Sequence, residues 1–109
     1  MRNQIVVPTL PPTLDTLVAA LCADYQRREK AIREGSVIHR VDTEYRYYNF
    51  KIYDAVAAIV GEGRCERIIK EIGGRIGYAH SALEEVSEVT YKKMKKEVKD
   101  AVARALHLI

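Results

Sequence analysis

Residues 87–109 read SEVTYKKMKKEVKDAVARALHLI, a segment that sorts apolar and basic side chains onto opposite sides of one helix. The apolar residues recur at steps of three and four, which is the spacing of one face of an α-helix. They are Tyr91, Met94, Val98, Ala101, Val102, Ala105 and Ile109. This stripe predicts a C-terminal helix that closes on a core built by the preceding residues.

The other side of this helix is predicted to be basic. Six Lys and Arg side chains stand against three acidic ones, a surplus equal to the formal net charge of the whole chain, +3. The basic residues are Lys92, Lys93, Lys95, Lys96, Lys99 and Arg104. Opposite-charge and like-charge pairs are mixed at four-residue spacing, so the helix does not neutralise itself regularly. A helix selected only for solubility has a similar face, but the cluster of lysines in residues 92–96 favours nucleic-acid contact.

Length and composition indicate a single soluble globular domain. The chain has 109 residues, of which 48% are hydrophobic and 30% charged, and no apolar run reaches membrane-spanning length. The N-terminal MRNQIVVPTLPPTL lacks the pattern of a secretory signal, so we expect a cytoplasmic protein with no membrane partner. Cys22 and Cys65 fall in apolar stretches, which predicts buried free thiols and no disulfide.

The first sixty residues predict an irregular arm followed by a helical hairpin. Three prolines make residues 1–12 irregular, and Thr13 is expected to cap a helix that runs to about Glu34 and ends at Gly35. Its apolar face comprises Leu14, Leu17, Val18, Leu21, Tyr25 and Ile32, whereas QRREK at residues 26–30 is expected to be solvated. A second helix is expected from about residue 38 to Val60, and two such helices joined by a short turn should pack antiparallel.

The second helix is unusually rich in aromatic residues. Its apolar stripe is predicted to be Ile38, Val41, Tyr45, Tyr48, Ile52, Ala55, Val56 and Ile59. Tyr47, Phe50 and Tyr53 lie off this stripe, where they either cover other helices or expose aromatic surface. An exposed surface of this kind is typical of an oligomer interface and, less often, of base stacking.

The remaining residues predict a third helix and a turn before the C-terminal helix. The third helix spans about Arg64 to Ile72, and the glycines at 73, 74 and 77 form a turn. Ser81 with Glu84 forms a capping box for a short helix, Ala82 to Val86, and Ser87 caps the last helix. An alternative stays open, because Leu83, Val86, Thr90, Met94 and Val98 are also in phase as one continuous helix.

The end of the chain resembles a known family of DNA-binding proteins. Residues 77–109, GYAHSALEEVSEVTYKKMKKEVKDAVARALHLI, are similar to the C-terminal part of phage-encoded transcriptional regulators of the ArpU and RinA type. Those proteins resemble in turn the promoter-reading end of sigma factors. The similarity rests on Ser81, Leu83, Ser87, Thr90, Tyr91, Lys95 and the terminal ARALHLI.

The resemblance implies a helix-turn-helix whose recognition helix is the last helix of the chain. It makes Leu83 and Val86 the core of the scaffold helix, Ser87 the turn and cap, and Tyr91 and Met94 inward-facing. The DNA-binding candidates are Ser87, Thr90, Lys92, Lys93, Lys95, Lys96 and Lys99. The turn between Val86 and Thr90 is shorter than in sigma-factor modules, which usually carry a glycine there.

Catalytic and metal-binding patterns are absent from the sequence. His39, His80 and His107 fall on different predicted elements, and neither cysteine belongs to a CxxC pair. There is also no nucleophile elbow or dinucleotide fingerprint. We therefore expect no enzyme, no metal and no cofactor.

The predicted fold is all-α, in a single domain of residues 1–109. It consists of an arm (1–12), an antiparallel helical hairpin (13–60) and a helix-turn-helix-like region (64–109). The expected function is double-stranded DNA binding, as in a phage or prophage transcriptional regulator, and a homodimer stays open. The alternative is a helical protein-interaction or assembly module, and a terminase-like small subunit would both oligomerise and bind DNA.

Overall fold

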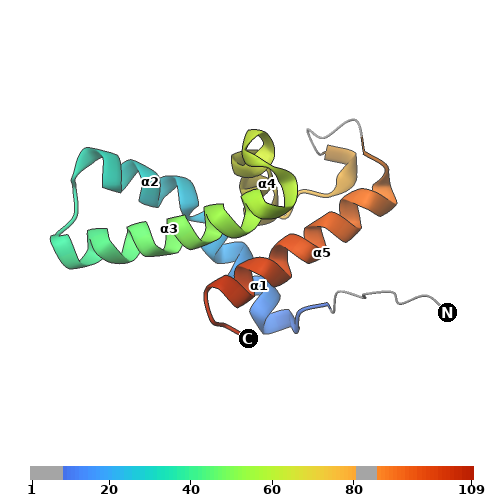
Figure 1. Ribbon diagram of the computed structural model, residues 1–109, viewed down its shortest axis with the longest axis horizontal. Helices are drawn as coiled ribbons and strands as arrows, with labels where there is room; N and C mark the ends of the chain where they lie inside the picture. Colours follow the sequence, from blue (N-terminus) through green and yellow to red (C-terminus); the bar gives the residue numbers. More distant parts are fainter. Residues whose placement is uncertain (1–8, 81–85) are drawn as a thin grey trace.

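The computed structural model describes residues 9–80 and 86–109, and in these ranges every regular element is helical (Figure 1). The α-helices are α1 (Pro12–Ala23), α2 (Tyr25–Glu34), α3 (His39–Val60), α4 (Glu62–Gly73) and α5 (Glu88–Ala105). A short 3-10 helix, η1 (Tyr78–His80), lies between α4 and α5. The predicted all-α class is therefore confirmed. The short helix predicted at residues 82–86, with its Ser81–Glu84 capping box, lies outside the described residues except for Val86, which is in a bend.

Helix α3 is the longest element and links the two parts of the molecule. Its first half runs antiparallel to α2, and this hairpin extends to one end of the molecule (Figure 1). Its second half packs against α4 and α5, near the point where α2 follows α1. The molecule is consequently elongated, with extents of 53 × 29 × 23 Å.

The core lies where α1, α3, α4 and α5 meet. Its fully buried side chains are apolar and come from all four helices: Val18, Cys22, Ile52, Val56, Cys65, Ile68, Ile69, Ile72, Tyr91, Val98 and Val102. Both cysteines are free and buried, as predicted. Burial raises the pKa of Cys22 to about 12 and that of Cys65 to about 11, so both thiols remain protonated at neutral pH.

The first arm of the predicted hairpin is two helices and not one. Asp24 interrupts the helix, and its carboxylate accepts two hydrogen bonds of 2.6 Å from Arg27. The predicted cap at Thr13 is also wrong, because Pro11 occupies the N-cap position and Pro12 is already helical. Proline suits the first helical position, since its φ is preset and the amide hydrogen it lacks would have no partner there. Gly35 ends α2 in the left-handed conformation (φ 62°), as predicted.

The break at Asp24 lets α1 leave the hairpin and pack against α4. The two helices touch where α4 ends, and a Cβ built on Gly73 would lie only 2.5 Å from the Cα of Ala23. Gly73 therefore does more than break the helix, which was its predicted role. It belongs to α4 and permits backbone contact with α1.

The buried face of α3 differs from the predicted stripe. Ile52 and Val56 are fully buried as predicted, but Tyr48 is 36% exposed and its neighbour Asn49 is only 3% exposed. Ile38 and Ile59, two further members of the predicted stripe, are also exposed. Helix α2 approaches the side of α3 that carries Asn49, so the buried face is rotated away from Tyr48.

Asn49 belongs to a buried polar cluster that joins α2 to α3. Its amide donates to the Tyr25 carbonyl (3.1 Å) and to the Glu29 carboxylate (2.8 Å). Its own carbonyl accepts from the Arg28 Nε at 2.7 Å. Arg28 is 3% exposed and also donates to the Leu21 carbonyl at 2.6 Å. The expectation that residues 26–30 form a solvated face is therefore wrong for Arg28.

Removing the Asn49 side chain should destabilise the hairpin. Asn49→Ala leaves the buried Arg28 Nε without its acceptor, and an unsatisfied buried charged donor costs about 2–3 kcal/mol. Glu44→Ala, an exposed position of the same helix, is the matched control and should change the free energy of unfolding by less than about 0.5 kcal/mol. Urea denaturation of both variants measures the difference, and equal stability would contradict the role of the cluster.

The contact at Gly73 gives a second stability prediction. Gly73→Ala places a methyl group against the Ala23 backbone, so α1 and α4 must separate, and we expect a loss of about 1–3 kcal/mol. Gly63→Ala is the control, because a Cβ there meets no atom within 4 Å and alanine favours the helix. Thermal unfolding should therefore show a lower Tm for Gly73→Ala and an unchanged or higher Tm for Gly63→Ala.

Candidate nucleic-acid interface

Helix α5 starts where the sequence predicts. Ser87 is extended (φ −73°, ψ 161°), and its hydroxyl oxygen accepts from the Thr90 backbone amide at 3.2 Å. The two hydroxyl groups are also hydrogen-bonded, at 2.9 Å. Ser87 is thus the N-cap of α5, as predicted. The alternative of one helix that continues through Val86, Thr90 and Val98 is wrong, because Ser87, between Val86 and Thr90, is extended.

One side of α5 is anchored in the core. Tyr91 is buried, and its hydroxyl lies 2.7 Å from a carboxylate oxygen of Glu71, which is itself buried in α4. The ring of Tyr91 also lies 5.7 Å from that of Tyr78 in η1. Further along the helix, Val98 and Val102 are fully buried. These contacts fix the rotation of α5 about its axis, and with it the residues that face outward.

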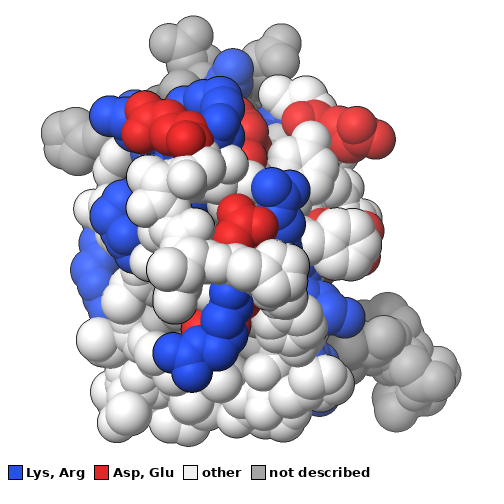
Figure 2. Space-filling model, turned by 90° about the vertical axis from the view of Figure 1, so that its left-hand side faces the viewer, with Lys and Arg blue, Asp and Glu red and all other residues white. Residues whose placement is uncertain are grey.

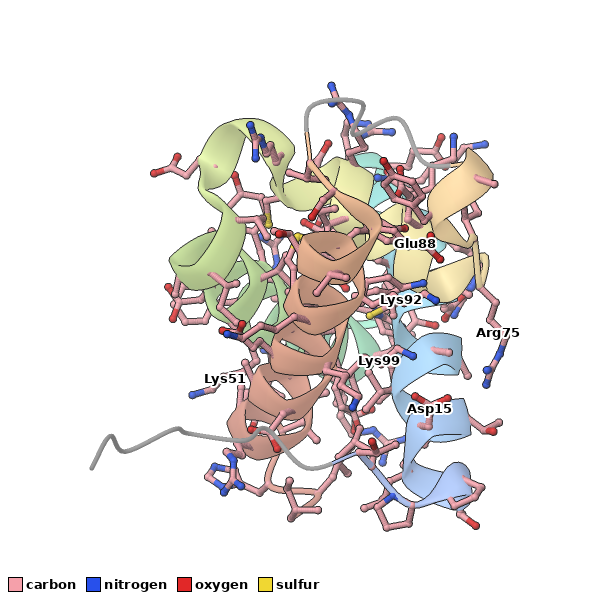
Figure 3. The ribbon with its side chains drawn as sticks, turned by 90° about the vertical axis from the view of Figure 1, so that its right-hand side faces the viewer. Asp15, Lys51, Arg75, Glu88, Lys92 and Lys99 are labelled. Atoms are coloured by element: carbon pink, nitrogen blue, oxygen red, sulfur yellow. The ribbon has the colours of Figure 1, made fainter. Side chains whose placement is uncertain are left out.

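The outward side of α5 presents three exposed lysines, Lys92, Lys93 and Lys96. Val89 lies on the same side one turn before Lys93 and is 79% exposed. Lys92 pairs with Glu88 at 2.9 Å, and both side chains are well exposed, as Figure 3 shows. Exposed pairs of this spacing are weak, about 0.3–0.5 kcal/mol, so Lys92 can exchange its partner readily. Within residues 9–80 and 86–109, Lys93 and Lys96 make no ion pair.

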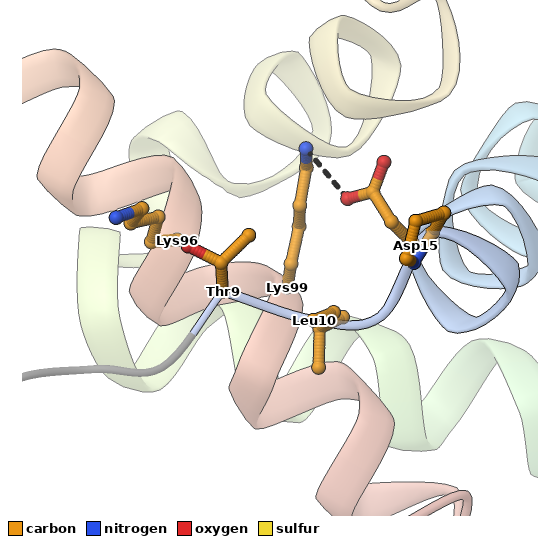
Figure 4. Close-up of a pocket in the computed structure, with 6 residues that line it drawn as sticks. Thr9, Leu10, Asp15, Lys96 and Lys99 are labelled. Carbon is orange, nitrogen blue, oxygen red and sulfur yellow. Dashed lines mark ion pairs between the residues drawn. The ribbon is translucent and has the colours of Figure 1, made fainter.

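Lys99 points away from this surface and joins α5 to α1. Its Nζ lies 2.9 Å from Asp15 Oδ1, and Arg75 approaches the other oxygen of the same carboxylate at 3.3 Å. Figures 3 and 4 show Lys99 directed toward α1. In Figure 4, Lys96 lies on the opposite side of the segment that carries Thr9 and Leu10, and it points away from Asp15. The hydrogen bond from Lys99 and the two nearby cations hold the pKa of Asp15 below its usual value.

Lys95 is also held within the protein. Its Nζ donates to the Ile76 carbonyl at 2.7 Å and lies 5.3 Å from the centre of the Tyr91 ring. Burial is the main cause that lowers the pKa of this half-buried ammonium. Lys95 and Lys99 therefore connect α5 to the turn after α4 and to α1. The candidates that remain available to a ligand are Lys92, Lys93 and Lys96, with Thr90 beside them at the helix start.

The sequence itself indicates which lysines of α5 face the protein, although the predicted DNA-binding set includes all five lysines of the helix. Lys95 and Lys99 follow Tyr91 at four-residue steps, so they share its side of the helix. A shallow groove of about 370 Å³ lies beside Lys99 and is lined by Lys96, Lys99, Asp15, Thr9, Leu10 and Pro12 (Figure 4). No sequence signal identified Arg75, which has a positive φ of 53° and reaches Asp15 from the turn after α4.

Comparison with known proteins adds no relative to this description. No protein-family model, no curated protein and no solved structure matches the chain. In the part of the chain that the structure describes, no helix is long and apolar enough to span a bilayer. The same residues contain no group of three or more His, Cys, Asp and Glu side chains placed to hold a metal ion.

The contact between Asp15 and Lys99 predicts a pH-dependent stability. The folded-state pKa of Asp15 is below its unfolded value, so its stabilisation is complete above about pH 4 and disappears as the pH falls through the folded value. Asp15→Asn should therefore lower the free energy of unfolding by about 1 kcal/mol at pH 7. Urea titrations should show this difference shrinking as the pH falls below about 4, and a difference independent of pH would contradict the ion pair.

Proposed function

We propose that this protein binds double-stranded DNA through the outward side of α5, as a phage or prophage transcriptional regulator does. The observation that supports the proposal is the placement of Lys92, Lys93 and Lys96. All three are exposed on one side of a helix whose opposite side is buried through Tyr91, Val98 and Val102. A folded helix holds these clustered cations in a fixed arrangement, and phosphate contacts from such a helix position it on a duplex.

The residues of this surface have different roles in the proposal. The three lysines contact phosphates, and each contact releases condensed counterions and so contributes affinity on any sequence. Val89 and Thr90 lie in the first turn of α5, the part of a recognition helix that meets base edges. Thr90 can use its hydroxyl, whereas Val89 can only make apolar contact, for example with a thymine methyl group.

The anchoring contacts of α5 have a separate part in the proposal. Lys95 bonds the Ile76 carbonyl and Lys99 pairs with Asp15, so neither needs to touch DNA for its charge to be satisfied. They hold the helix against α1 and the turn after α4. Among the lysines of α5, we therefore assign DNA contact only to Lys92, Lys93 and Lys96, a narrower set of lysines than the sequence predicted.

Neutralising the outward lysines should weaken binding to every duplex. In the triple variant Lys92→Ala, Lys93→Ala and Lys96→Ala, three phosphate contacts are lost. The slope of log affinity against log salt should then become less steep by roughly 2.7, since each contact contributes about 0.9. Fluorescence anisotropy with a labelled random duplex at several salt concentrations measures this slope.

The matched control removes three exposed cations from other elements: Arg33→Ala, Arg67→Ala and Lys70→Ala. It has the same net charge as the test variant, so any difference between the two reports position and not total charge. Near-native circular dichroism for both variants establishes that they fold. Equal loss of affinity in both, or none in either, would refute the assignment of α5 as the contact surface.

A further inference from the structure

The surface of the α2–α3 hairpin collects exposed apolar side chains away from α5. Phe50 is 66% exposed and Tyr47, one turn before it, is 44% exposed. A groove of about 300 Å³ lies beside Phe50, which forms part of its lining together with residues of both helices, among them Ile32 and Tyr53. An exposed aromatic knob and a groove thus lie on the same face of a two-helix unit.

The charges of this groove have both signs. Glu29 lies on its α2 side and Arg46 on its α3 side. Arg46 Nε donates to Asp42 of its own helix at 2.7 Å, and the side chain is otherwise 62% exposed. Figure 2 views the end of the molecule to which the hairpin extends, and there acidic and basic groups are interspersed with uncharged surface. Because one acidic and one basic side chain line the groove, no single-sign field opposes the approach of an identical face.

We propose that the hairpin pairs with the hairpin of a second copy of this chain about a two-fold axis. In such an isologous interface each surface must be complementary to itself, and this face meets that condition in two ways. Phe50 of each copy enters the groove of the other, and Glu29 of each copy meets Arg46 of the other. Two paired hairpins form a four-helix arrangement, which buries the apolar face that two helices alone leave open.

The hairpin is prepared for this contact by its buried cluster. Asn49 accepts from Arg28 and donates to the Tyr25 carbonyl, contacts that do not involve the Glu29 side chain, and these hydrogen bonds fix the spacing of α2 and α3 before any partner arrives. A rigid face loses little conformational entropy on association. Because the contact rests on one aromatic side chain and one surface ion pair from each copy, we expect a dissociation constant in the micromolar range.

Exchange of the two groove charges tests the pairing directly. Glu29→Lys places two cations together in each contact of its homodimer, and Arg46→Glu places two anions together. Each variant alone should remain a 12.4 kDa monomer at concentrations where the native chain has twice that mass. An equimolar mixture should dimerise again. In the mixed dimer the introduced lysine faces the introduced glutamate, and the native Arg46 of one chain faces the native Glu29 of the other, so both contacts are attractive.

Analytical ultracentrifugation of the full chain over about 1–200 µM gives these masses, with circular dichroism to establish folding. Phe50→Ala should raise the dimer dissociation constant at least about 30-fold, since every dimer contains the contact twice. Ile59→Ala, an exposed apolar position outside the groove on the same helix, should leave it unchanged. A native chain that stays monomeric throughout, or a dimer indifferent to Phe50→Ala and to the charge exchange, would overturn the proposal. The measurement contains no DNA, so its outcome is independent of the function proposed for α5.

Discussion

The contact between the Tyr91 hydroxyl and the buried Glu71 carboxylate, at 2.7 Å, sets the orientation on which the surface of α5 depends. An α-helix has no intrinsic outside, and its exposed residues are those left over once its buried ones are fixed. Tyr91 fixes the first turn against α4, and Val98 and Val102 continue the same side into the core. A rotation of one residue, about 100°, would bury lysines and expose this stripe.

The same orientation gives lysines of one helix different physical roles. Lys95 and Lys99 stand on the flank of the buried stripe, where desolvation must be offset by a carbonyl or a carboxylate within reach. The Ile76 carbonyl and Asp15 supply those partners at 2.7 and 2.9 Å. Lys93 and Lys96 stand on the far side, where water solvates them. A count of basic residues treats the two groups alike, although only the second can exchange its hydration for a phosphate without breaking a contact within the protein.

The sequence predicted features that depend on local chemistry and missed those that depend on which helix is the neighbour. Capping preferences predict Ser87 as the N-cap of α5 and Gly35 as the end of α2. Helical periodicity predicts the buried Tyr91, Val98 and Val102. Tyr48 and Asn49 are one residue apart, and only the position of α2 determines which of them is buried. Arg28 likewise belongs to a segment with the composition of a solvated helix. In the fold it is buried, and it donates hydrogen bonds to Asn49 and to the Leu21 carbonyl. The packing of α1 against α4 next to the break at Asp24 requires Gly73, because a Cβ there would lie 2.5 Å from Ala23, fifty positions away in the sequence.

Helix α3 connects the two surfaces for which functions are proposed. Arg46, in its first half, and Phe50, at its middle, line the groove, and its second half contributes Ile52 and Val56 to the core that holds α5. A continuous helix of this kind transmits position rigidly, with a rise of about 1.5 Å for each residue. If two copies pair through their hairpins, the separation of the two α5 helices is therefore set by α3 and not by a flexible linker. A DNA-binding dimer built in this way would accept half-sites at one spacing only, because changing that spacing requires breaking either the hairpin contact or the core.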